Sequence, residues 1–245
     1  MKTVMIYGSP VPYDIQRVKK RKTIQISFTP EGTLSLKTPY ALTEGEAVKI
    51  LSGKANWIHN QRQRLADLSG NPVNGNFAPD ALLLYLGQKY RLKLITADKD
   101  LVFIDGETLV VQCGAPPAAL QETAQKLLLS WYIEQARTAF VSRTRYWAEI
   151  IGVSPLRITI RDQKTRWGSC STKGSLNYSW RLIMAPSPVL DYLVIHELCH
   201  MKAANHSPSF WRLVANYTAD YSRHRRWLKD NGNVLMRLFA SNTFI

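Results

Sequence analysis

The chain has 245 residues, of which 45% are hydrophobic, 10% aromatic and 20% charged. This balance is ordinary for a globular protein and excludes an intrinsically disordered one. No run of about 18 apolar residues occurs, which excludes a membrane-spanning helix, so no membrane partner is expected. Lysine and arginine number 32 against 18 aspartates and glutamates, and the net charge of +14 favours an anionic partner, either a nucleotide or nucleic acid. An inert basic surface accounts for this charge equally well.

The cysteines and the first residues indicate a reducing compartment. The three cysteines, Cys113, Cys170 and Cys199, cannot all form disulfides, and they lack the paired C-x-x-C spacing of a structural zinc site. The apolar stretch that follows Met1 is too short for a secretory signal peptide. We therefore expect free thiols and a cytoplasmic location.

The first half of the chain is predicted to be rich in strands. Apolar residues alternate between Lys22 and Thr38 on both sides of Pro30-Glu31-Gly32, which predicts a hairpin with one apolar face. Thr43 is a typical N-cap for a helix that runs to about Leu68. The composition then predicts a loop over 69–79 and short strands over 82–86, 90–95, 101–104 and 109–112. No internal repeat is visible.

Gly114-Ala115-Pro116-Pro117 is the best candidate for a domain boundary. It separates a β-rich N-terminal region with one helix, residues 1–115, from a second domain, residues 116–245. A long helix over about 118–150 opens the second domain, and strands over 157–160 and 176–180 are expected to pair as a hairpin. The predicted fold class is therefore α+β: a β-rich half precedes a half with a long helix, a small antiparallel sheet and one further, chemically distinctive helix.

That last helix carries the most informative motif, His196-Glu197-Leu198-Cys199-His200. The apolar run 190–195 precedes the motif and predicts that the helix is largely buried. Residues four apart lie on the same helix face, so both imidazoles can bind one ion, and imidazole is a common zinc ligand. Glu197 lies about 100° around the helix from His196, where its side chain reaches a water on that ion without having to ligate it. Metal-assisted hydrolysis requires this combination of ligands and base.

A catalytic zinc ion usually takes three protein ligands and a water. The candidates downstream of the motif are His206, His224, Asp220 and Asp230, because no glutamate follows. His206 is the best of these if the chain turns at Asn205, which tolerates the left-handed conformation, and if Ser207 and Pro208 then begin a new helix. His224 lies among three arginines and is expected on a solvated basic face.

Two blocks of sequence are more specific than the motif alone: Trp167-Gly168-Ser169-Cys170, and the motif followed by Asn205-His206-Ser207. Together with Leu176-Asn177 and Phe210-Trp211, they resemble the YgjP-like metallopeptidase family. The resemblance covers nearly the whole chain and is dense from Ser130 to Gly232. It implies a zincin-like peptidase fold, zinc at His196, His200 and His206, and Glu197 as the general base.

The segment between the two predicted strands of the second domain is expected to border the substrate. Zincins commonly place an antiparallel edge strand above the metal, and peptide substrates bind to it as an extra strand. Trp167 and Ser169 are placed to border such a cleft, and Arg166 to bind an anionic group. Two alternatives stay open: Trp167 packs beneath a turn, and Arg166 only holds that turn.

The predicted function is hydrolysis of peptide bonds in a peptide or protein substrate by a zinc-bound water, with one zinc ion per chain and Glu197 as general base. One alternative is a metal-dependent hydrolase of nucleotide phosphoanhydrides, which the positive charge suits although no glycine-rich phosphate loop is present. Another is a nucleic-acid-associated protein whose peptidase site acts on bound partners.

Overall fold

A computed structural model describes residues 2–29, 33–66, 80–116, 119–163 and 165–237. Contacts divide the chain into two compact units, Met1–Ser69 and Gly70–Ile245. Helices and strands are mixed along the chain, which confirms the predicted α+β class. The loop predicted over 69–79 lies outside the described residues.

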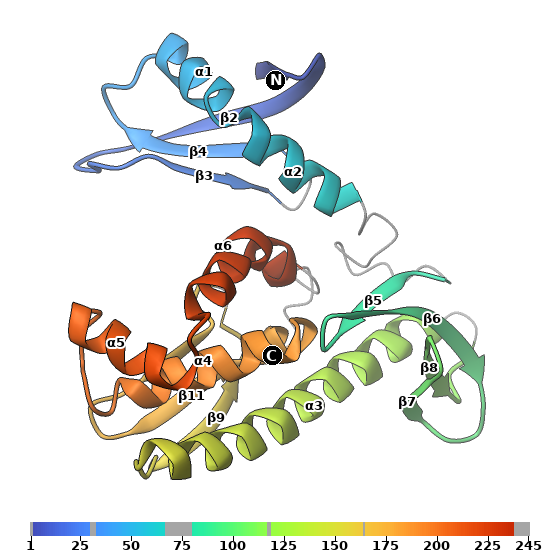
Figure 1. Ribbon diagram of the computed structural model, residues 1–245. Coiled ribbons are helices and arrows are strands. Elements are labelled where there is room, and N and C mark those ends of the chain that lie inside the picture. The colour runs from blue at the N-terminus through green and yellow to red at the C-terminus, as the bar shows by residue number, and fades with distance from the viewer. Residues whose placement is uncertain (1, 30–32, 67–79, 117–118, 164, 238–245) are drawn as a thin grey trace. The chain divides into compact units, whose positions relative to one another are not determined.

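The first unit is a four-stranded sheet followed by two helices (Figure 1). The strands are β1 (Lys2–Ile6), β2 (Ser9–Val18), β3 (Gln25–Phe28) and β4 (Leu34–Pro39), in the order β1-β2-β4-β3. β2 and β4 pair in parallel, and the other two pairs are antiparallel. The predicted hairpin is confirmed as β3 and β4, whereas β1 and β2 were not predicted, because Pro10 and Pro12 interrupt the usual composition of a strand.

The helix predicted from Thr43 onwards is divided into α1 (Glu44–Ser52) and α2 (Ala55–Ala66). Thr43 is the N-cap as predicted: its side chain accepts a hydrogen bond from the Glu46 backbone N–H, and the Glu46 carboxylate accepts one from the Thr43 N–H at 2.8 Å. The first helix ends at Gly53, its C-cap, and glycine is a weak helix former.

The second unit begins with a sheet that repeats the pairing scheme of the first. Its strands are β5 (Leu82–Tyr85), β6 (Gln88–Thr96), β7 (Leu101–Asp105) and β8 (Thr108–Cys113), in the order β5-β6-β8-β7. The middle pair is again parallel and the outer pairs are antiparallel. All four predicted strands are confirmed. The repeat was not visible in the sequence, since it is a repeat of topology and not of residues.

The long helix α3 (Leu120–Ile151) joins this sheet to the rest of the second unit. Near its start, Tyr132 donates a hydrogen bond to the Leu84 carbonyl of β5 at 2.8 Å. Leu92 and Leu109 of the sheet share one buried core with Leu128 of the helix. This packing places the division between compact units at Ser69 and Gly70, and not at the predicted boundary of residues 115 and 116.

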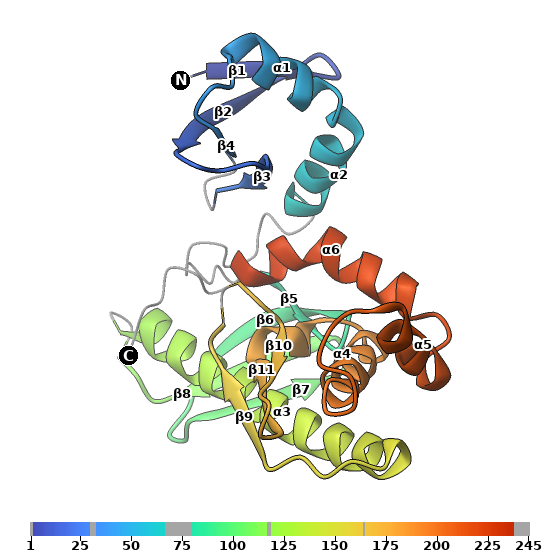
Figure 2. The same cartoon turned by 90° about the vertical axis from the view of Figure 1, so that its left-hand side faces the viewer.

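A three-stranded sheet follows α3, in the order β10-β11-β9. Its strands are β9 (Arg157–Arg161), β10 (Gly168–Cys170) and β11 (Ser175–Ser179). β11 pairs in parallel with β9 and antiparallel with β10, so the sheet is mixed and the predicted hairpin of the first and last strands is wrong. The reason is the connection between them, which itself forms the edge strand β10 (Figure 2).

Helices complete the second unit. They are the 3-10 helix η1 (Trp180–Met184), α4 (Ser187–Cys199), α5 (Pro208–Tyr217) and α6 (Tyr221–Arg237). α4 carries the histidine motif and is buried along most of its length, including Val194 and Leu198 at 0% exposure, as its apolar sequence predicted. Among the described helices, none is long and apolar enough to cross a membrane.

Candidate metal centre

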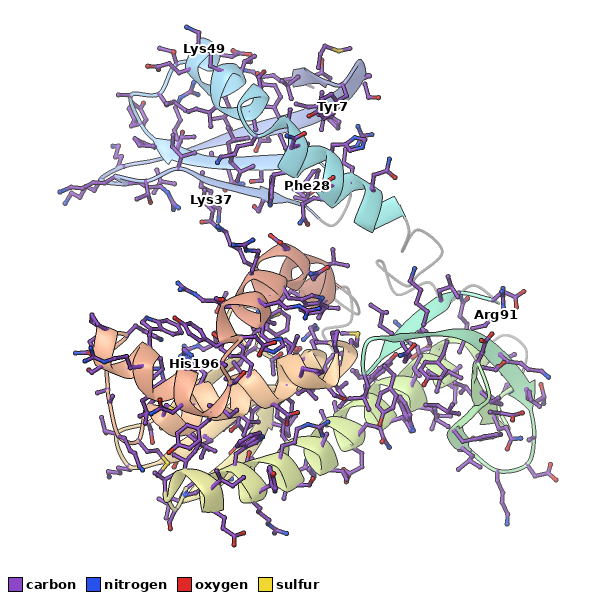
Figure 3. The ribbon with its side chains drawn as sticks, viewed as in Figure 1. Tyr7, Phe28, Lys37, Lys49, Arg91 and His196 are labelled. Atoms are coloured by element: carbon purple, nitrogen blue, oxygen red, sulfur yellow. The ribbon has the colours of Figure 1, made fainter. Side chains whose placement is uncertain are left out.

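α4 brings the first two histidines of the motif together. His196 and His200 lie one turn apart, and their ring centroids are 4.8 Å apart. Both side chains direct the Nε2 atom to the same point, with 3.2 Å between the two nitrogens. Figure 3 labels His196 on α4. The His196 ring also contacts Phe210 of α5, with 5.0 Å between the ring centroids.

His206 joins this pair from the joint between α4 and α5. Its Nε2 atom lies 3.1 Å from that of His196, and the ligand atoms of all three histidines lie within 4.8 Å of one another. Ser207 caps α5 by accepting a hydrogen bond from the Phe210 N–H, as the sequence predicted. The expected left-handed turn at Asn205 is wrong: its φ is not positive, and its side-chain oxygen instead accepts a hydrogen bond from the Ser207 N–H at 3.2 Å.

His224, the other histidine considered as a third ligand, lies outside this group. Its ring pairs with Asp220, the residue just before α6, at 3.2 Å and packs against Tyr192. The side chain is only 12% exposed, so the expectation of a solvated position is also wrong. Among the described residues, His196, His200 and His206 are the group of three that could hold a metal ion.

Two of the three separations between these nitrogens match a tetrahedral zinc site, and all three lie within 4.8 Å. Zn–N bonds of about 2.0–2.1 Å in a tetrahedral shell place two ligand nitrogens about 3.3 Å apart, close to the two distances between the Nε2 atoms. His200 Nδ1 lies 3.2 Å from the Ala203 carbonyl, which fixes a proton on Nδ1 and directs the Nε2 lone pair to the centre. Hydrogen bonds among the three histidines cannot pair all three converging nitrogens, whereas one cation can bind all of them.

Burial prepares His196 and His200 as neutral ligands, and aromatic packing holds all three rings. Burial lowers the pKa of His196 to about 3, and it also lowers the pKa of His200. Phe210, fully buried, stacks on the His200 ring at 4.5 Å, and Trp211 stacks on the His206 ring at 5.5 Å. The rings are therefore held in place by packing as well as by their own elements.

Glu197 lies beside the histidines and against the edge strand β10. Its side chain is buried, and this burial raises its pKa to about 7, against the opposing effect of the Arg166 charge. A Cβ atom on Gly168 would lie only 2.6 Å from Glu197 Oε1, so the close approach of the carboxylate requires glycine at that position. This contact between α4 and β10 was not predicted.

Two adjoining cavities flank the Glu197 side chain. The first, of about 370 Å³, is lined by β10 and the three histidines, and Ser169 is among its walls. The second, of about 340 Å³, is lined by Trp167 and by residues of α4 and α6. Both cavities share Gly168, His196 and Glu197, so they adjoin at the same carboxylate.

The remaining predicted site residue, Arg166, is exposed and lines neither cavity, although its charge acts on Glu197. Sequence reasoning missed the contribution of α6, which supplies Arg225, Leu228 and Lys229 to the second cavity. Their spacing marks them as one helix face, but nothing local indicated what that face contacts.

A family model described as YgjP-like, metallopeptidase domain, matches residues 22–231 of the chain. No curated protein and no solved structure matches it.

Proposed function

The chain belongs to the family of YgjP-like metallopeptidase domains, and on that premise we propose that it is a zinc-dependent peptidase. The observation that carries the proposal is the convergence of three Nε2 atoms beside a buried glutamate, next to a strand edge. His196, His200 and His206 would hold the ion, and Glu197 is the proposed general base. The roles of these four residues are part of the proposal.

When bound, zinc supplies a Lewis acid that lowers the pKa of a coordinated water and polarises a carbonyl group. Glu197 lies beside the three histidines, where its carboxyl group can accept and donate a proton. As a carboxylate it accepts a proton from the attacking water, and as an acid it donates this proton to the leaving amine. Burial raises the pKa of this carboxyl, whereas the charge of a bound zinc ion would lower it, which favours the carboxylate form that accepts the first proton.

We propose that the peptide binds along β10. Among the described strands, β10 pairs only with β11, so the other edge of Gly168–Cys170 offers its backbone groups to an added strand. Ser169 lies in the middle of this edge and lines the first cavity. Its hydroxyl accepts a hydrogen bond from Asn177 Nδ2 at 3.3 Å, which orients the side chain.

A degradation experiment tests the proposed activity. The zinc-loaded protein is incubated with an unbiased peptide library and, separately, with nucleoside triphosphates, and the products are identified by mass spectrometry. We expect new peptide termini that disappear with a chelator and return with added zinc. Release of phosphate from the nucleotides without any new peptide termini would contradict the proposal and favour the phosphoanhydride hydrolase.

Gly168→Ala tests the contact between β10 and Glu197. The added methyl group would lie 2.6 Å from Glu197 Oε1 and must displace the carboxylate. Because a misplacement of about 1 Å can cost about a hundredfold in rate, we expect kcat to fall by about that factor while zinc content is unchanged. Gly45→Ala, which meets no atom within 4 Å, is the matched control. Full activity of Gly168→Ala would show that the carboxylate works from another position.

A further inference from the structure

The cavity on the α6 side of Glu197 differs in chemistry from the one above the histidines. Trp167, Tyr192 and Leu228 give it apolar walls, and Arg225 and Lys229 add two cationic groups. We call the space that these residues enclose the basic subsite. Glu197 is one of its lining residues, so the basic subsite adjoins the reacting centre of the proposed function.

The α6 wall of the basic subsite is a single helix face. Arg225, Leu228 and Lys229 are spaced three and four residues apart, and Gly232 continues the same face by one further turn. A Cβ atom on Gly232 would lie 2.9 Å from the Trp167 indole, so the absence of a side chain lets this ring lie against the helix. Trp167 is thereby fixed between β10 and α6.

The two cations of the basic subsite are available to a ligand. The Arg225 guanidinium lies over the Trp211 ring at 4.7 Å, which restrains its orientation without neutralising its charge. No ion pair joins Arg225 or Lys229 to a carboxylate of the described chain. The Arg225 charge acts on Tyr192 and His196, which line the same cavity.

We propose that the basic subsite binds a carboxylate of the substrate on the carboxyl side of the scissile bond. The side follows from the direction of β10, which runs from Gly168 at the basic subsite to Cys170 at the histidine cavity. A peptide that pairs antiparallel with this edge, the more frequent arrangement, places its C-terminal part at Gly168. Repulsion from Glu197 and attraction by Arg225 and Lys229 favour a position of the carboxylate beside the two cations.

The proposal rests on the proposed peptidase function, and peptide variants test it. Starting from one cleaved peptide, the first three residues after the scissile bond are changed in turn to Glu or Gln. We expect wild-type kcat/KM to be about tenfold higher for Glu at one of these positions, because one partly exposed charged hydrogen bond is gained. Lys229→Met and Arg225→Met should each bring this ratio close to one, and Lys229→Glu should invert it.

Arg226→Met is the matched control, since Arg226 lies on the same helix but not in the subsite, and the ratio should stay at the wild-type value. A preference for Glu only on the amino side of the bond, or equal ratios in all variants, would overturn the proposal. Calorimetric titration with the C-terminally amidated dipeptides of Gly-Glu and Gly-Gln, which have no terminal carboxylate, keeps the test independent of catalysis. Tighter binding of Gly-Glu that Lys229→Met removes supports the subsite even if no peptide is cleaved, and equal binding of the two dipeptides overturns it.

Discussion

Glu197→Gln is expected to lower kcat for peptide hydrolysis by about a hundred- to ten-thousandfold, the range that a positioned general base contributes. Glutamine preserves the size of the side chain beside Gly168 but cannot accept the proton of the attacking water. The buried position favours a neutral group, because burial is the cause of the raised pKa of this carboxyl. The variant should therefore fold normally and lose only the chemical step.

Zinc content separates the role of a base from that of a ligand. We expect Glu197→Gln to retain about one zinc ion per chain, measured by atomic emission after dialysis. Glu149→Gln, an exposed change on α3, is the control and should alter neither activity nor metal content. Loss of zinc together with activity would show that Glu197 binds the ion directly.

His196→Ala, His200→Ala and His206→Ala are each expected to weaken zinc binding by roughly a hundredfold or more. Structural zinc sites bind with about 10–16 kcal/mol, which gives about 3 kcal/mol for each of four ligands. His224→Ala is the matched control, because this histidine pairs with Asp220 and lies outside the group of three. Its zinc affinity should stay within about threefold of wild type.

Competition with a chelator of known affinity measures all four variants. His206→Ala is the most informative, since its side chain is exposed and comes from the joint between helices rather than from α4. If His224→Ala loses zinc and His206→Ala does not, the ligand set drawn from the geometry is wrong.

Local patterns explain what the sequence predicted well. The spacing of His196 and His200 fixes their common face, and Ser207 with Pro208 fixes the start of α5, so both are properties of a few neighbouring residues. The mixed sheet and the contact of Gly168 with Glu197 depend on segments that meet only in the folded chain. The α6 wall also depends on such a contact. In the sequence, Arg225 and Lys229 are indistinguishable from residues of a solvated basic face, and only the contact of Trp167 with Gly232 in the folded chain places them in a cavity.

The packing of α3 also determines how precisely the metal ligands are placed. The helix has 32 residues and is about 48 Å long. It contacts β5 through Tyr132 and, further along, stacks Phe140 on Tyr178 of β11 at 4.5 Å, while Trp147 donates a hydrogen bond to Asp191 of α4. A tilt of only about 5° about one end would move the other by about 4 Å, twice the length of a Zn–N bond. Its contacts with β5, β11 and α4 therefore restrict the tilt of α3 and hold α4, which carries His196, in position.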